Sequence, residues 1–191
     1  QTHGHKGFLL TIEKANELLA INESYKDVIH PFLNGEELLG NKNSRPGRYV
    51  IDFRGKDVFE AQRYNEAYNH IYQNVYPEKK KKAEAEQEKN LQALEINPSF
   101  KCKKDHQAAF KKWWLLFRDR GELMDVISKK ERYIACSRVT KRPVFEFIST
   151  CISPNDALTV FPMDDDYSFG VVYCPLFYTE RRLEIYLRKC I

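Results

Sequence analysis

Residues 132–147 read RYIACSRVTKRPVFEF, two strand-like apolar runs on either side of a polar segment that contains three cations. Two further strand-like runs follow as ALTVF and FGVVYC, whereas helical patterns dominate the earlier part of the chain. Helices followed by strands, without an internal repeat, predict an α+β domain. The expected fold is therefore a mixed or antiparallel twisted sheet with flanking helices.

The N-terminal half contains two helical patterns and one short strand pattern. In TIEKANELLAIN, apolar residues recur at helical spacing behind Thr11, which is a good helix cap. Residues 56–76 carry a single apolar stripe that ends at Pro77, and this predicts a second helix. Between these patterns, a polar loop leads into a strand predicted over residues 49–53.

Residues 78–106 differ from the rest of the chain because they are highly charged and contain few apolar anchors. Four consecutive lysines in EKKKKAEAEQEK are followed closely by glutamates, which neutralise the positive charge along the same stretch. That pattern favours a solvated helix over a track that binds phosphates. We interpret residues 78–106 as a charged helical insertion in a single domain over residues 1–191.

The composition is that of a globular protein. The 191 residues are 42% hydrophobic, 13% aromatic and 30% charged, and the net charge of +4 is too small to identify a partner by itself. No apolar run approaches the roughly 20 residues of a membrane span. Five cysteines without CxxC pairs, and no signal peptide, predict reduced thiols and a cytoplasmic location. Because the chain begins with Gln1, we expect it to be a fragment of a longer polypeptide.

No catalytic or metal-binding set of residues is predicted. The acids Asp164, Asp165 and Asp166 could serve a nuclease, but their turn-like position favours a capping role. Asn97–Phe100 reads NPSF and resembles the Asn-Pro-Pro-aromatic signature of N6-adenine methyltransferases. Serine replaces the second proline, however, and no glycine-rich cofactor turn precedes the tetrapeptide. Cys102 and His106 lack the further ligands that structural zinc needs.

Basic residues between the two strand-like runs are the best candidates for binding DNA. If residues 136–142 are extended, Arg138, Thr140 and Arg142 share one face, because side chains alternate along a strand. Arginines on such a face could read guanine edges, while nearby cations hold phosphates. A solvated hairpin loop explains the same charges, so charge alone leaves both interpretations open. The complete candidate set is Asn43, Arg45, Arg48, Lys111, Lys112, Ser137, Arg138, Thr140, Lys141 and Arg142.

Several stretches taken together resemble one family. Four stretches are similar, in this order, to the target recognition domain of single-chain type II restriction-modification enzymes of the IIG or IIL kind: QTHGHKGFLLT, VIHPFLNGEELLGNKNSRPGRYVIDF, WWLLFRDRGELMDVISKKERYIACSRVTKRPVFEF and DDDYSFGVV. The resemblance runs from residue 1 to about residue 175. In such enzymes a nuclease, an N6-adenine DNA methyltransferase and a recognition domain share one polypeptide.

The resemblance implies a DNA recognition domain that is not catalytic by itself. The methyltransferase domain, with its S-adenosylmethionine, would lie upstream in the same chain, and Mg²⁺ would be needed if a nuclease is present. Double-stranded DNA would be the partner, read in the major groove while one adenine is flipped out. Two departures are Arg142, where members often have histidine, and the stretch 78–106. The alternatives are a protein-interaction module, or a DNA-processing enzyme that uses Asp164–Asp166.

Overall fold

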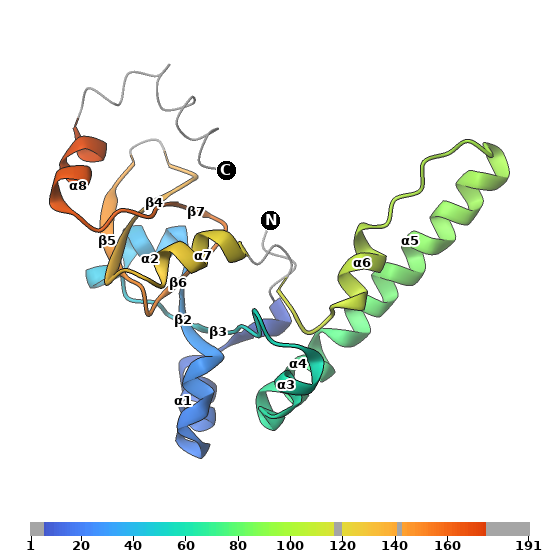
Figure 1. The fold of residues 1–191 in the computed structure, drawn as a ribbon, viewed down its shortest axis with the longest axis horizontal. Helices are drawn as coiled ribbons and strands as arrows, with labels where there is room; N and C mark the ends of the chain where they lie inside the picture. The colour runs from blue at the N-terminus through green and yellow to red at the C-terminus, as the bar shows by residue number, and fades with distance from the viewer. Residues whose placement is uncertain (1–5, 117–119, 141–142, 175–191) are drawn as a thin grey trace. The chain divides into compact units, whose positions relative to one another are not determined.

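The computed structural model describes residues 6–116, 120–140 and 143–174. The chain divides into two compact units, the first formed by Gln1–Ile29 and Ile51–Asp119, the second by His30–Val50 and Arg120–Ile191. Helices and short strands alternate up to β3, after which the helices α3 to α7 and then the strands β4 to β7 follow one another before α8 (Figure 1). The α+β class is confirmed, with parallel and antiparallel strand pairs. In the described ranges, no helix is both long and apolar enough to cross a membrane.

The first unit is mainly helical. Thr11 caps its first helix by accepting a hydrogen bond from the backbone N–H of Lys14 at 3.3 Å, as its position predicts. The elements described in this unit are the 3-10 segments Lys6–Phe8 and Glu23–Asp27, β1 (Leu9–Leu10), α1 (Ile12–Ile21), α3 (Val58–Gln62), α4 (Asn65–Asn74), α5 (Tyr76–Ile96) and α6 (Asp105–Lys111).

The single helix predicted over residues 56–76 is wrong, because the structure breaks it into α3, α4 and the start of α5. The first break lies at Tyr64, whose backbone is not helical at φ −94° and ψ 63°. The Tyr64 ring packs 5.9 Å from the rings of both Tyr25 and Phe53, which come from distant parts of the chain. Tertiary packing of one aromatic ring therefore overrides the local helical period.

The double tryptophan is part of the core of the first unit. Trp113 is buried, and the rings of Tyr68, Tyr72 and Tyr76 lie 5.3, 5.6 and 5.3 Å from it in edge-on geometry. The neighbouring Trp114 donates its indole N–H to the carbonyl of Lys56 at 3.1 Å. These aromatic contacts attach the segment after α6 to the helices α4 and α5.

The charged stretch forms the long helix α5, against which α6 returns (Figure 1). Asn90 holds the connection by bonding both the N–H and the carbonyl of Lys103, at 3.1 and 2.5 Å. The buried carboxylate of Glu86 accepts the N–H groups of His106 and Gln107 and so caps α6 from another helix. The predicted helix is present up to Ile96, whereas residues 97–104 are not helical, and the status of residues 78–106 as an insertion remains a prediction.

The second unit is built on a three-stranded antiparallel sheet in the order β5-β4-β7. β4 (Arg132–Ser137) is central, and its Ile134 lies opposite Phe147 of β5 (Phe145–Ser149) and Phe161 of β7 (Leu158–Phe161). Beside this sheet, β2 (Ile29–Leu33) pairs in parallel with β6 (Ser153–Pro154), and β3 (Tyr49–Ile51) neighbours β2 on its other side.

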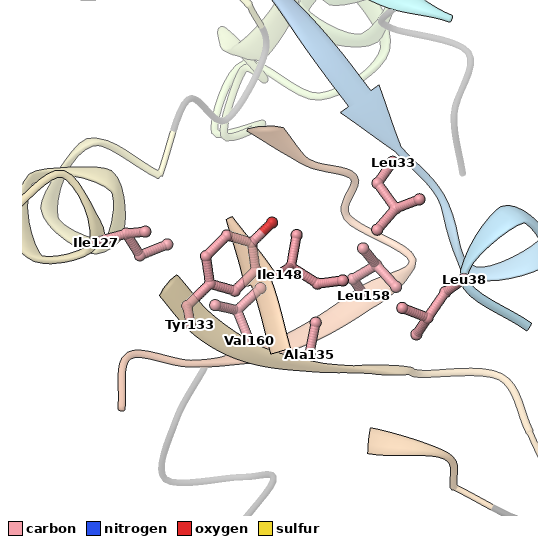
Figure 2. Packing of buried hydrophobic residues seen from close by; sticks show 8 residues of the cluster. All are labelled: Leu33, Leu38, Ile127, Tyr133, Ala135, Ile148, Leu158 and Val160. Carbon is pink, nitrogen blue, oxygen red and sulfur yellow. The ribbon is translucent and has the colours of Figure 1, made fainter. Parts of the chain in front are cut away.

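Both faces of the β5-β4-β7 sheet are covered, and α2 (Gly35–Gly40) and α7 (Gly121–Ile127) cover one of them. Figure 2 shows the buried side chains of that face converging: Leu33, Leu38, Ile127, Tyr133, Ala135, Ile148, Leu158 and Val160. The opposite face carries Ile134, Cys136 and Phe145, packed against residues that include Phe147, Phe161, Phe169 and Val172. Because side chains alternate between the two faces of a strand, β4 contributes buried residues to the hydrophobic cluster on each face of the sheet.

The strand predicted at FGVVYC is wrong, because residues 169–173 belong to the helix α8 (Asp166–Tyr173). Asp165 precedes the helix and accepts a hydrogen bond from the N–H of Ser168 at 2.7 Å, which starts the first turn. Phe169 and Val172 are three residues apart, so they share a helix face and pack together on the sheet. The capping role predicted for the acidic triplet is confirmed at Asp165.

Candidate nucleic-acid interface

The connection from β4 to β5 is the first segment of the candidate interface. β4 ends at Ser137, and Arg138 and Val139 form a bend, so the extended geometry on which the shared face of Arg138 and Thr140 depended is not present. The chain leaves the sheet after the Arg138 N–H donates to the carbonyl of Ala157 at 2.8 Å. Arg138 and Val139 are exposed, the latter at 81%, and Thr140 is half-buried. The candidates Lys141 and Arg142 lie outside the described residues.

Ser137 lies beneath this connection, and it is buried at 6% exposure. A Cβ atom at Gly35 would come within 2.6 Å of the Ser137 hydroxyl oxygen, so the close approach of α2 to β4 favours glycine at that position. The start of α2 is thereby fixed beside the end of β4. A direct contact between the Ser137 hydroxyl and DNA remains a prediction.

The loop after α2 holds three more candidates. Asn43 and Ser44 adopt left-handed backbone angles, with φ of 59° and 50°, and Ser44 donates its hydroxyl to the carbonyl of Leu38 at 3.2 Å. The carbonyl of Arg45 accepts a hydrogen bond from the side chain of Asn41 at 2.7 Å. These bonds hold the loop in shape while the side chains of Asn43 and Arg45 are exposed.

Arg48 connects this loop to the first turn of α2. Its guanidinium forms an ion pair with Glu37 at 3.0 Å and keeps 41% of its side chain exposed. Glu37 in turn forms a capping box with Asn34, in which each side chain accepts the backbone N–H of the other residue. Asn34 precedes Gly35, which contacts Ser137. The loop that carries Arg48 is therefore anchored on the first turn of α2, and this turn lies close to Ser137 at the end of β4.

Sequence reasoning missed Arg120, which lies in this second unit. Its guanidinium donates to the carbonyl of Asp156 at 3.5 Å, next to the Ala157 carbonyl that Arg138 uses. Burial lowers the pKa of Arg120; the nearby Asp156 opposes this shift, and the nearby Arg138 adds to it. The only local sequence signal was the cluster of charges in FRDRGEL, and it does not reveal this proximity.

The two remaining candidates belong to the first unit. Lys111 is the last residue of α6 and Lys112 follows it, and both side chains are exposed. They precede Trp113, whose burial fixes the backbone at this point. The predicted DNA-binding residues are thus divided between the two units, with Asn43, Arg45, Arg48, Ser137, Arg138 and Thr140 described in the second.

The acids Asp164–Asp166 are all used in structural contacts. Asp164 pairs with Lys130 at 2.8 Å, and the hydrogen bond from Lys130 lowers the pKa of the carboxyl. Asp166 pairs with Arg132 at 2.8 Å. The pKa of Asp165 is lowered mainly by the backbone N–H of Ser168. Among the described residues, no group of three or more histidines, cysteines or acids is placed to hold a metal ion.

Comparison with known proteins gives one structural likeness. No protein-family model matches the chain, and no curated protein matches it by sequence. The structure is similar to that of the type IIL restriction-modification enzyme MmeI in complex with DNA, with a TM-score of 0.51 at 14% sequence identity. The match covers 87% of this chain and 19% of that enzyme, so this chain spans about a fifth of the enzyme's length. The chain therefore has a fold that occurs within a restriction-modification enzyme.

Proposed function

We propose that the chain is a DNA sequence-recognition domain of a restriction-modification N6-adenine methyltransferase, non-catalytic by itself. The observation that carries the proposal is the likeness of fold, over most of this chain, to part of a restriction-modification enzyme solved in complex with DNA. The exposed cations of the second unit support it, because hydrogen bonds anchor their loops, from Arg48 to Glu37 of α2 and from the Arg138 N–H to the Ala157 carbonyl. Such loops can present guanidinium groups to DNA with little loss of entropy.

Some residues of these loops would contact base edges, and others would contact phosphates of the DNA backbone. Arg138 and Thr140 would contact base edges in the major groove, where a good bidentate pair discriminates by about 1–3 kcal/mol. Arg45, Arg48 and Asn43 would hold phosphates and fix the register. Lys141 and Arg142 would extend the same basic segment. In the first unit, Lys111 and Lys112 would add phosphate contacts that carry no sequence information.

The other parts of the proposal concern the rest of the polypeptide. A methyltransferase domain in the same chain would bind S-adenosylmethionine and accept an adenine flipped out of the duplex. A nuclease domain, if present, would use Mg²⁺. The proposed location is the cytoplasm, where such a polypeptide meets DNA.

Salt-dependent binding of duplex DNA tests the proposal. We expect the 191-residue chain to bind fluorescently labelled DNA duplexes at low ionic strength. The logarithm of the binding constant should fall linearly with the logarithm of the salt concentration. The measurement is fluorescence anisotropy over a salt series. No binding even at low ionic strength would contradict the proposal and favour the protein-interaction module.

Selectivity is tested at Arg138. In a selection from randomised duplexes, Arg138→Gln should change or relax the recovered sequences while the unfolding midpoint is unchanged, because the side chain is exposed. Lys129→Gln is the matched control, since Lys129 is also an exposed cation of the second unit. Equal selectivity in wild type and Arg138→Gln would remove Arg138 from the base-reading set. Methylation by the chain with S-adenosylmethionine, or cleavage with Mg²⁺, would instead show an enzyme.

A further inference from the structure

Arg120 and Arg138 come from separate segments and converge on one turn. The backbone N–H of Arg138 donates to the carbonyl of Ala157 at 2.8 Å, and the guanidinium of Arg120 donates to the carbonyl of Asp156 at 3.5 Å. Arg120 precedes α7, whereas Arg138 follows β4. Consecutive carbonyls of the turn that leads into β7 therefore anchor both arginines.

This turn is a rigid support. Asn155 is buried, and its side-chain oxygen accepts the N–H of Ala157 at 2.8 Å. The backbone N–H of Asn155 donates to the carbonyl of Leu33 at 2.9 Å, and the N–H of Leu158 returns to the Asn155 carbonyl at 3.0 Å. Because these bonds tie the turn to β2 and β7, the positions of Asp156 and Ala157 are set by the core of the unit.

The backbone of Arg120 is unusual. It is left-handed, with φ 49° and ψ 42°, a conformation that costs free energy in any residue with a Cβ atom. Glycine would adopt it without that cost, yet the chain has arginine here and glycine at the next position. Strained backbone conformations cluster at functional sites, so an arginine in this conformation indicates a functional role for its side chain.

Within the described ranges, the guanidinium of Arg120 makes one hydrogen bond, to the Asp156 carbonyl. Its bond to the Asp156 carbonyl is at the outer limit of hydrogen-bond length, which leaves most of its donors for another acceptor. It is half-buried at the base of the connection whose exposed part carries Arg138. A cation that is held in place in this way suits a phosphate, which accepts guanidinium hydrogen bonds bidentately.

We propose that Arg120 binds a phosphate group of the DNA backbone and thereby positions the duplex for reading by Arg138. The inference rests on the proposed function, and it adds a binding residue that lies outside the candidate set. Arg120 would contribute affinity and register, because phosphate contacts carry no sequence information, and Arg138 would contribute selectivity.

Arg120→Gly tests the inference because glycine keeps the left-handed backbone while the guanidinium is removed. We expect an unfolding midpoint that is equal or higher, and duplex binding about tenfold weaker for every sequence. The slope of log affinity against log salt should fall by about 0.9, the value for one phosphate contact. Arg120→Lys should keep most of that slope. Lys129→Gln removes the same charge from the other end of α7 and should change neither affinity nor slope.

The outcomes separate this inference from the proposed function. Absence of duplex binding by the wild-type chain overturns the proposed function. If the wild type binds and Arg120→Gly matches Lys129→Gln in affinity and slope, Arg120 does not bind phosphate. A lower unfolding midpoint with unchanged binding assigns the guanidinium a structural role. Altered selectivity in Arg120→Gly assigns it to base reading, which also overturns the inference.

Discussion

Alanine in place of Gly35 should destabilise the second unit through one contact with Ser137. The added Cβ atom would lie 2.6 Å from the Ser137 hydroxyl oxygen and 3.3 Å from its Cβ atom, whereas the next neighbour, the Ala157 carbonyl, is at an ordinary 3.5 Å. Ser137 is buried at 6% exposure, so its hydroxyl has little room to turn away. The clash is therefore specific to a single side chain.

Two effects of opposite sign decide the size of the change caused by Gly35→Ala. Overpacking a well-filled site costs about 1–3 kcal/mol. Replacing glycine by alanine in a helix gains at most about 0.5–1 kcal/mol, and Gly35 is only the first residue of α2. We expect a net loss of about 1–2 kcal/mol in the free energy of unfolding. In thermal unfolding, this loss corresponds to a midpoint that is lower by roughly 2–8 °C.

The assay is urea unfolding followed by far-ultraviolet circular dichroism, since both tryptophans lie in the first unit and would not report on the second. The same substitution in a Ser137→Ala background should be nearly neutral, because the oxygen that the new Cβ atom meets is absent. The coupling free energy between the two positions should thus be about 1–2 kcal/mol. An equal effect of Gly35→Ala in both backgrounds would refute this reasoning.

Three further predictions concern buried polar groups. Burial lowers the pKa of Lys79 from 10.5 to about 8, so between these pH values the unfolded chain binds one proton more than the folded chain. The urea midpoint of unfolding should therefore rise with pH across this window, and it should rise less in Lys79→Met. Tyr133→Phe removes the hydroxyl bond to the Ile152 carbonyl at 2.9 Å and should cost about 0.5–1.5 kcal/mol in urea unfolding. Asn90→Ala should accelerate amide hydrogen exchange at Lys103 more than in the core of the first unit, since both bonds to that residue are lost.

Much of the local structure was readable because it depends on neighbours in the chain. Thr11 and the period after it predict α1, and alternation in RYIAC and VFEFI predicts the paired strands β4 and β5. The capping role of the acidic triplet was predicted from its position between apolar runs, and Asp165 confirms it.

Other features depend on residues far apart in the sequence, and only the tertiary structure decided them. Tyr64 breaks a helix because its ring packs on Tyr25 and Phe53. Glu86 caps a helix that begins nineteen positions later in the chain, at Asp105. The local pattern of apolar residues does not predict such contacts, because they form only when separate segments pack together.

At the candidate interface, too, some features were predictable from the sequence and others depend on tertiary packing. The sequence by itself determined that cations are concentrated between β4 and β5 and near β3, and that the acids after β7 have a capping role. Only the tertiary structure decided that β4 stops at Ser137 and that a turn before β7 holds Arg120 close to Arg138. Charge is a property of the composition, whereas the proximity of two charges is set by the packing of α2, α7 and the sheet.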